Sequence, residues 1–261
     1  SPDVICGKCF DCRQHAGYSW CQNMQLLYGN NATCTEPPYL FGGFAEYMYL
    51  IPGTHVYKVP DGVSNEIAAL AELMSCTMNV DKAKEFYSFS GEGFAVNDTV
   101  VVQGVGPLGI THMIKARILG AGKIVAIDTS DYRLQMAKDF GADYVINAAG
   151  TTAKDRETYI KELTHGRGAD LVMECVGRPE MLPEAMNMIR KGGMILEVGN
   201  FCDMGEVPIN VHHICGKNIR IIGMSSLVYN AFTPMMEMMD YYKKWFPFDK
   251  LVTHKYALED T

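Results

Sequence analysis

The sequence has no apolar run that approaches the length of a transmembrane helix, which needs about 20 residues. It also has no block of like charge, because 30 acidic and 23 basic side chains are interspersed and give a net charge of −7. Nothing in it therefore points to a membrane protein, or to binding of nucleic acid or of an anionic membrane. No export signal follows Ser1, so we expect a cytoplasmic protein.

What the chain does contain is enough apolar material for a sizeable core. It has 261 residues, of which 48% are hydrophobic and 20% charged, and this is typical of one large or two ordinary globular domains. Five of its nine cysteines lie before residue 35 and the other four are scattered. In a cytoplasmic chain of this size, that distribution favours a metal site over disulfide bonds.

Residues 99–109 (TVVVQGVGPLG) carry the most specific pattern in the chain. Val100–Val102 is a short β-branched run that predicts a strand buried on both faces. Glycines follow at GxGxxG spacing, and Pro107 stands where the first turn of a helix would begin. A second strand, Lys123–Ile127, ends in Asp128, roughly 20 residues after the glycines. This context is the one that a dinucleotide-binding fingerprint requires.

Each part of this pattern has a role in holding a dinucleotide. Gly104 permits the tight turn, Gly106 lets the backbone approach a pyrophosphate, and Gly109 lets the helix pack close to the sheet. Asp128 can accept hydrogen bonds from both adenosine ribose hydroxyls and repels a 2′-phosphate, so we expect NAD rather than NADP. NADP stays open because residues that can also hold a phosphate follow: Thr129, Ser130 and Arg133.

The N-terminal lobe, residues 1–36, contains cysteines at C-x2-C-x2-C-x8-C spacing: Cys6, Cys9, Cys12 and Cys21. Four thiolates in a short, loop-rich lobe suit a tetrahedral zinc site that is closed to water. An iron–sulfur cluster is the alternative, but ferredoxin sequences continue x3-C-P after such a run and Ala16 stands at that position here. Cys34 could replace Cys21 as a ligand, although it lies beyond a Gly-Asn-Asn turn.

Beyond Asp128, short apolar runs alternate with helical patterns. Helices are expected at residues 131–140, 155–164 and 180–190, and strands at residues 144–146, 170–175, 194–198 and 219–222. This alternation predicts a doubly wound parallel (Rossmann) α/β sheet that binds its ligand at the carboxyl ends of the strands. Further cofactor contacts are therefore expected around those ends: Pro107, Leu108, Cys175, Val176, Gly177, Val198, Gly199, Asn200, Met224 and Ser225.

Outside that sheet, residues 41–50 and 251–256 are expected to be strands, the second returning to the first domain. Helical patterns run from Asn65 to about Phe86 and from residue 234 to 245. Glu72 is notable as a carboxylate in an otherwise apolar stretch (IAALAELM), although an acid on a helix surface is the commoner case. His212 and His213 precede an edge strand, where such a pair is more often structural, and we do not assign them as ligands.

The motifs as a set resemble the zinc-containing medium-chain alcohol dehydrogenases, the family of alcohol, sorbitol and threonine dehydrogenases. They run in family order over essentially the whole chain: CGKCFDC with a later Cys, GGFAEY, VPDGVS, AALAEL, NDTVVVQGVGPLGI, VAIDTSDYRLQMAKDFGAD, GADLVMECVG, KGGMILEVG and LVTHKYALED. The resemblance implies a structural zinc on the four cysteines of the lobe. Glu72 matches a glutamate beside the catalytic zinc, with Leu73 in place of the usual proline, and Cys76 would lie near the nicotinamide.

One departure from the family concerns the catalytic zinc, which family members hold with a cysteine and a His-Glu pair that precede the structural lobe. The sequence starts almost at that lobe, so we expect a segment of a longer protein. Three parts are expected: the remainder of a mainly-β catalytic (GroES-like) domain at 1–76, a dinucleotide-binding domain at 77–228 and a return segment at 229–261.

The implied function is hydride transfer between NAD and a primary or secondary alcohol or its carbonyl product, with zinc, in a homo-oligomer that is a dimer or a tetramer. A rival from another class is a non-catalytic NAD-binding module that uses the zinc lobe for assembly. A nucleic-acid binder built on the lobe is disfavoured by the acidic balance of the chain.

Overall fold

The computed structural model describes residues 1–14, 20–84, 91–225 and 229–260. The chain divides into two compact units. The first, here called the cysteine unit, consists of residues 1–76 and 227–261, and the second, the sheet unit, consists of residues 77–226.

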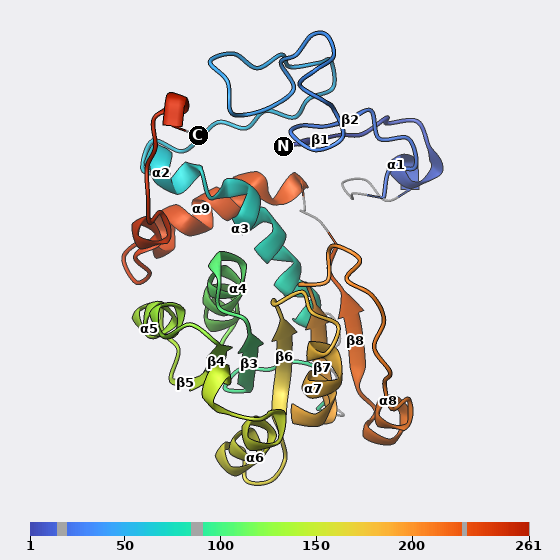
Figure 1. The fold of residues 1–261 in the computed structure, drawn as a ribbon, viewed down its shortest axis with the longest axis vertical. Helices are drawn as coiled ribbons and strands as arrows, with labels where there is room; N and C mark the ends of the chain where they lie inside the picture. Colours follow the sequence, from blue (N-terminus) through green and yellow to red (C-terminus); the bar gives the residue numbers. More distant parts are fainter. Residues whose placement is uncertain (15–19, 85–90, 226–228, 261) are drawn as a thin grey trace. The chain divides into compact units, whose positions relative to one another are not determined.

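The sheet unit is built on six parallel strands in the order β5-β4-β3-β6-β7-β8 (Figure 1). Their bounds are β3 Thr99–Gln103, β4 Lys123–Asp128, β5 Tyr144–Asn147, β6 Ala169–Glu174, β7 Ile189–Glu197 and β8 Arg220–Gly223. The order reverses beside β3, since the chain first runs outward to β5 and then crosses back to β6. An open α/β sheet binds its ligand at such a reversal, so the doubly wound fold expected from the sequence is confirmed.

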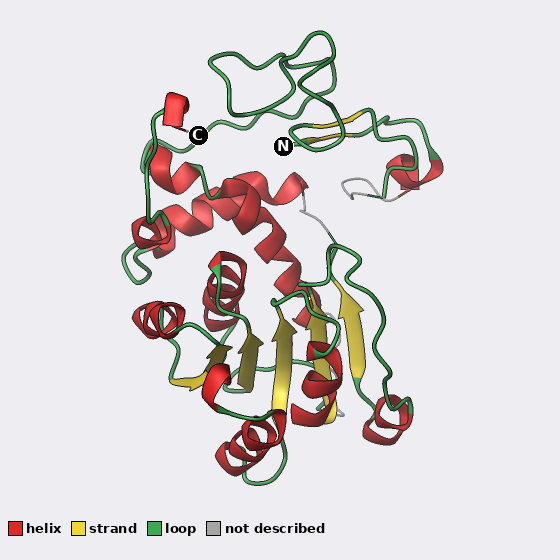
Figure 2. Ribbon diagram, in the orientation of Figure 1, coloured by secondary structure: helices red, strands yellow, loops and turns green. Residues whose placement is uncertain are grey.

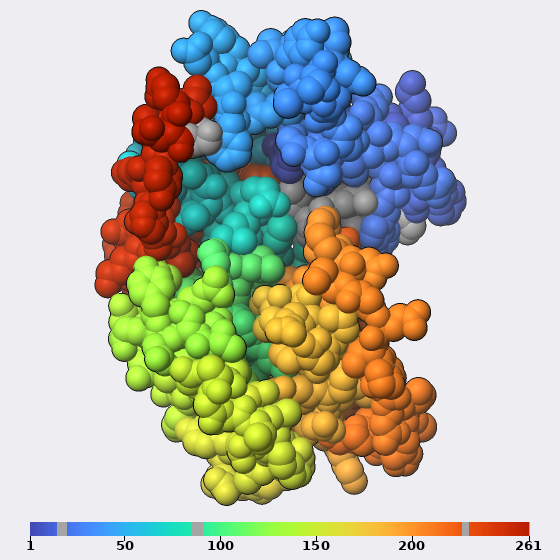
Figure 3. Space-filling model, viewed as in Figure 1, coloured from blue at the N-terminus to red at the C-terminus, as the bar shows by residue number. Residues whose placement is uncertain are grey.

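Helices connect the strands of this unit (Figure 2). They are α4 Pro107–Ile118, α5 Asp131–Asp139, α6 Ala153–Leu163, α7 Met181–Met188 and α8 His212–Lys217, with 3₁₀ turns η1 Met78–Lys84 and η2 Ala148–Gly150. Right-handed crossovers place α4 and α5 on one face of the sheet, and α6 and α7 on the other. Val101, Val125, Val172 and Ile195 are buried between these layers. The space-filling view shows one face of this unit in green to orange (Figure 3).

The cysteine unit has little regular structure in its described residues. Its elements are β1 Asp3–Val4, α1 Phe10–Gln14, β2 Leu26–Leu27, α2 Asn65–Ala68, α3 Ala71–Thr77, η3 Tyr229–Ala231, α9 Phe232–Tyr242, η4 Phe248–Leu251 and η5 Leu258–Asp260. β1 pairs antiparallel with β2, and Ser64 begins α2 by accepting a hydrogen bond from the N–H of Ile67. Helix α3 continues one residue past the unit boundary.

Two expected strands are wrong. Residues 41–50 and 252–256 form no strand, and Leu251 belongs to η4. A strand needs a neighbour to pair its backbone groups, and among the described residues neither segment has a ladder partner. Residues 41–50 make only isolated bonds, such as Tyr49 N–H to Leu40 O at 3.0 Å.

Smaller corrections concern where elements begin and end. The helix expected at 180–190 ends at Met188, because Ile189 already pairs with Ala169 as the start of β7. His212 and His213 lie in α8, which precedes the edge strand β8. The long helix expected from Asn65 is divided into α2, α3 and η1, and its expected end at Phe86 lies outside the described residues. In the part of the chain that is described, no helix is long and apolar enough to cross a membrane.

Candidate functional site

The turn between β3 and α4 gives each of its three glycines a different constraint. Gly104 has φ +79°, and a Cβ there would lie 2.8 Å from Val176 Cγ2. A Cβ on Gly109 would lie 1.9 Å from Gly104 O, so only glycine lets α4 start this close to the turn. A Cβ on Gly106 would meet no atom closer than an Arg133 guanidinium nitrogen, 4.0 Å away. The space beside Gly106 is therefore open, as the approach of a pyrophosphate requires.

This open space lies at the N-terminus of α4, which begins at Pro107 with Gly106 as its N-cap. No side chain of the described residues caps this end of the 12-residue helix. Its first N–H groups and its dipole are thus available to an anion, and Leu108 and Gly109 lie in that first turn.

Asp128 ends β4 beside this turn, and its carboxylate is buried. Oδ2 accepts a hydrogen bond from Val105 N–H at 2.9 Å, and Oδ1 accepts one from Ser130 N–H at 3.0 Å. Arg133 Nη1 lies 3.9 Å from Oδ2. A carboxylate has about four acceptor positions, so this one keeps capacity for further donors such as hydroxyl groups.

A cavity of about 330 Å³ adjoins these groups. Residues expected from the sequence line it: Gly104, Gly106, Asp128, Arg133, Cys175 and Val176. The sequence analysis missed other lining residues: Gln103, Arg156, Arg178, Met181 and Glu184. Arg156 and Glu184 form a buried bidentate ion pair across α6 and α7, with both N–O distances 2.7 Å. Only the packing of the two helices brings this pair together, whereas Arg178, directly after the GADLVMECVG motif, could have been found.

The remaining expected contacts follow the other strands. Gly177 comes after β6, Val198, Gly199 and Asn200 follow β7, and Met224 and Ser225 follow β8. Parallel register brings the carboxyl ends of these strands to one edge of the sheet. These residues do not line the cavity beside Asp128. They follow the other strands of the same sheet edge.

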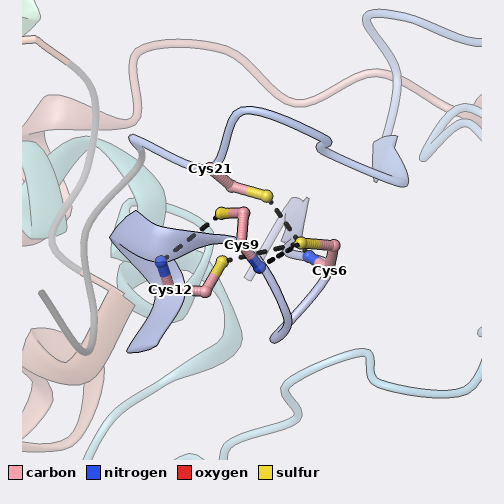
Figure 4. A group of neighbouring side chains, drawn as sticks. All are labelled: Cys6, Cys9, Cys12 and Cys21. Atoms are coloured by element: carbon pink, nitrogen blue, oxygen red, sulfur yellow. Dashed lines mark hydrogen bonds between the residues drawn. The ribbon is translucent and has the colours of Figure 1, made fainter. Parts of the chain in front are cut away.

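The cysteine unit contains a second candidate site, the four-cysteine cluster (Figure 4). Cys6 Sγ and Cys12 Sγ are 3.9 Å apart, and all four sulfur atoms of Cys6, Cys9, Cys12 and Cys21 lie within 4.8 Å of one another. A tetrahedral zinc with 2.3 Å bonds places its sulfur ligands about 3.8 Å apart, so the donor set fits one such ion. An iron–sulfur cluster needs more room because several irons and sulfides lie between its cysteines. The group includes Cys21 and excludes Cys34, which is exposed.

Backbone N–H groups point at these sulfur atoms. Lys8 and Cys9 N–H each lie 3.4 Å from Cys6 Sγ, and Cys12 N–H lies 3.5 Å from Cys9 Sγ. These bonds lower the pKa of Cys6 to about 6 and lower that of Cys9. Desolvation and the neighbouring thiols raise the pKa of Cys12 to about 12. Four thiols held this close cannot all ionise unless a cation shares their charge.

Glu72 and Cys76 face each other one turn apart on α3. Cys76 Sγ lies 3.5 Å from Glu72 Oε1, and burial, together with the charge of Glu72, raises the pKa of Cys76 to about 12. The Glu72 carboxylate is exposed and lines a cavity of about 550 Å³ in the cysteine unit. Among the described residues, the only group of three or more potential metal ligands is the four-cysteine cluster.

A doubly wound sheet with an open glycine turn is a dinucleotide-binding fold, and here it occurs in one chain with a four-thiol metal lobe. Residues 107–241 match the family model described as zinc-binding dehydrogenase. Sorbitol dehydrogenase of Bacillus subtilis is 30% identical over 260 residues, which are 100% of this chain and 67% of that protein. The chain belongs to the zinc-binding dehydrogenase family, as the motifs of the sequence indicate.

Solved structures agree with this assignment. An alcohol dehydrogenase from Thermotoga maritima superposes with a TM-score of 0.87 at 30% identity, covering 100% of this chain and 69% of that one. A protein of Escherichia coli CFT073, described as a short chain alcohol dehydrogenase complexed with the cofactor NADH, gives a TM-score of 0.80 at 25% identity. That comparison covers 99% of this chain and 68% of the E. coli chain.

Proposed function

We propose that the chain provides the cofactor-binding part of an NAD-dependent zinc alcohol dehydrogenase. Its reaction would transfer a hydride between NAD and a primary or secondary alcohol, or the corresponding aldehyde or ketone. The observation that carries the proposal is the open space at Gly106 between the start of α4 and the buried Asp128. Two relatives support it: one is named for oxidation of a polyol, and another is described in complex with NADH.

In this proposal the sheet unit binds and orients NAD. The first turn of α4 would bind the pyrophosphate, and the free acceptor positions of Asp128 would bind the adenosine ribose. The edge formed by residues 176–177, 198–200 and 224–225 would hold the nicotinamide half and fix the direction of hydride transfer.

Two zinc ions belong to the proposal. Cys6, Cys9, Cys12 and Cys21 would hold a structural ion that joins both ends of a short lobe. By the family resemblance, Glu72 would lie beside the second, catalytic ion, which when bound would lower the pKa of an alcohol toward neutrality. Glu72 is exposed, lines a cavity and has Cys76 one helical turn away. From this position its carboxylate could contact a metal ion.

A second candidate function is an NAD-binding module without catalysis, in which the lobe serves assembly. Such a module needs only one metal-ligand group, the four-cysteine cluster, which the described residues contain. For either function we also propose a homo-oligomeric state and three domain limits, 1–76, 77–228 and 229–261.

The test is to purify residues 1–261, titrate the protein with NADH by fluorescence, and assay a panel of small alcohols with NAD. Saturable NADH binding is the expected result. NADH binding without alcohol turnover agrees with a chain whose described residues contain only the ligands of the structural zinc. Zinc-dependent turnover would instead require that Cys76, His212 and His213 be reconsidered as ligands of a catalytic zinc. Absence of NADH binding would remove both candidate functions.

A further inference from the structure

Two carboxylates meet where β6 and β7 end. Glu174 and Glu197 are register partners on these neighbouring strands, and Glu174 is fully buried. Glu174 Oε1 accepts hydrogen bonds from Val176 N–H at 2.7 Å and Gly177 N–H at 3.0 Å. Glu197 Oε1 accepts hydrogen bonds from the side-chain amide of Asn200 at 2.8 Å and from its backbone N–H at 3.3 Å. Each carboxylate therefore holds the loop that follows its own strand.

The two loops are packed too closely to rearrange independently. A Cβ on Gly177 would lie 2.5 Å from Gly199 O, and a Cβ on Gly199 would lie 2.4 Å from Glu174 Oε2. The Asn200 amide nitrogen also reaches Glu174 Oε2, at 3.4 Å. A change in the position or charge of either carboxylate therefore alters the packing of both loops.

Glu197 Oε2 is enclosed by protein and finds no donor in the described part of the chain. A buried acceptor without a donor is costly, and two adjacent buried carboxylates that are both ionised repel each other. A single proton on Glu174 removes both problems, because it neutralises one carboxylate and supplies a donor to the other.

The electrostatic surroundings agree with that arrangement. Burial, together with the hydrogen bond and charge of Glu197, raises the pKa of Glu174 to about 7. The other titratable group packed here is the Cys175 thiol, whose pKa is raised by burial and by both carboxylates, so it stays neutral. No described basic side chain forms an ion pair with either glutamate.

We propose that Glu174 and Glu197 share one proton, and that this proton fixes the loops at residues 176–177 and 199–200 in the form that binds the nicotinamide half of NAD. Glu174 Oε2 carries the hydrogen and donates it to Glu197 Oε2. Both glutamates act as positioning residues, since they hold loop backbone and touch no reacting atom. The choice of ligand rests on the proposed function, whereas the shared proton does not.

The proposal predicts how NADH affinity changes with pH. Below about pH 7 the pair keeps its proton and affinity is constant. Above pH 7 two negative charges face each other and the loops separate, so affinity falls at least about fivefold by pH 9. Glu174→Gln keeps the hydrogen-bond pattern at every pH, because its amide oxygen accepts from the loop and its amide nitrogen donates to Glu197.

The experiment measures the NADH dissociation constant by fluorescence from pH 6 to pH 9 for three proteins: the natural chain, Glu174→Gln and the control Glu206→Gln, whose glutamate is exposed after β7. The expected result is a pH-dependent constant in the natural chain and in the control, and a flat one in Glu174→Gln. The same pH dependence in Glu174→Gln as in the natural chain, or no pH dependence in any protein, overturns the proposal.

A measurement without cofactor separates this proposal from the proposed function. Because folding raises the pKa of Glu174, its stabilising effect is complete below pH 4.5 and is lost as pH rises through about 7. The unfolding temperature should therefore fall more steeply between pH 5 and pH 7 in the natural chain than in Glu174→Gln. Glu197→Gln serves as a second variant if Glu174→Gln fails to fold, and it should weaken the same slope. Equal slopes overturn the shared proton even if NADH binds.

Discussion

At the scale of single residues, we propose that Asp128 selects which dinucleotide the sheet unit accepts. Its carboxylate is held in place by the N–H groups of Val105 and Ser130 and carries its charge beside Arg133. A 2′-phosphate placed there would meet a fixed negative charge, while ribose hydroxyls would meet free acceptor positions. The neighbouring guanidinium is the group that a 2′-phosphate would bind if the carboxylate were removed.

We expect Asp128→Ser to shift the preference from NAD toward NADP by about 1–3 kcal/mol, because it removes the repulsion and two charged hydrogen bonds. The ratio of the NADH and NADPH dissociation constants measures the shift. Asp131→Ser is the matched control, since Asp131 is exposed at the start of the following helix and accepts a hydrogen bond from the side-chain amide of Asn147. Equal affinity of the natural chain for both cofactors would show that Asp128 does not have this role.

At the scale of elements, the turn between β3 and α4 contains one glycine that packing requires and one that packing does not require. Gly109 is required by the chain's own packing, because a Cβ there would overlap the carbonyl oxygen of Gly104. Gly106 has φ −66°, which any residue adopts, and has open space around it. The fold does not require a glycine there, and we propose that the approach of a ligand does.

This difference predicts opposite results for two alanine variants. Gly109→Ala should lower the free energy of unfolding by about 1–3 kcal/mol, because α4 must move. Gly106→Ala should leave the unfolding temperature unchanged and weaken NADH binding about tenfold or more, because its Cβ occupies the approach of the pyrophosphate. Thermal unfolding and fluorescence titration of both variants measure the two effects. Unchanged affinity in Gly106→Ala would contradict a pyrophosphate at this turn.

The cysteine lobe should contain one zinc per chain and little iron. Cys21→Ser should lose this zinc, because three thiolates leave the tetrahedral site incomplete, whereas Cys34→Ser should retain it. Elemental analysis of the three purified proteins provides the measurement. A brown protein with visible charge-transfer absorption would instead indicate an iron–sulfur cluster.

At the scale of the whole molecule, β8 is the edge strand at one end of the sheet and leaves a row of backbone groups without a partner strand in the described chain. Met224 N–H bonds to Glu197 O, and since alternate residues of a strand face opposite neighbours, Gly223 N–H points away from β7. A second copy of this edge could pair with it and form a homo-oligomer.

If that pairing occurs, Gly223→Pro should reduce the assembly to a smaller species, because it removes an outward N–H without disturbing β7. Gly223→Ala should not, since its Cβ meets no atom within 4 Å and its N–H remains. Light scattering of the purified protein gives the molar mass in each case. A natural protein that is already a stable monomer would remove the idea.

Sequence alone was sufficient where the controlling contacts are local. The β3 strand, the glycine turn, α4 and the position of Asp128 follow from neighbours within about 30 residues, and the spacing of the four cysteines brings them together within one lobe. Tertiary structure decided whatever depends on a distant partner. Residues 41–50 have a strand-like pattern but form no strand, because pairing depends on a neighbour that the pattern does not contain. The carboxylates of Glu174 and Glu197 become a pair only through the register of β6 and β7, which no local rule specifies.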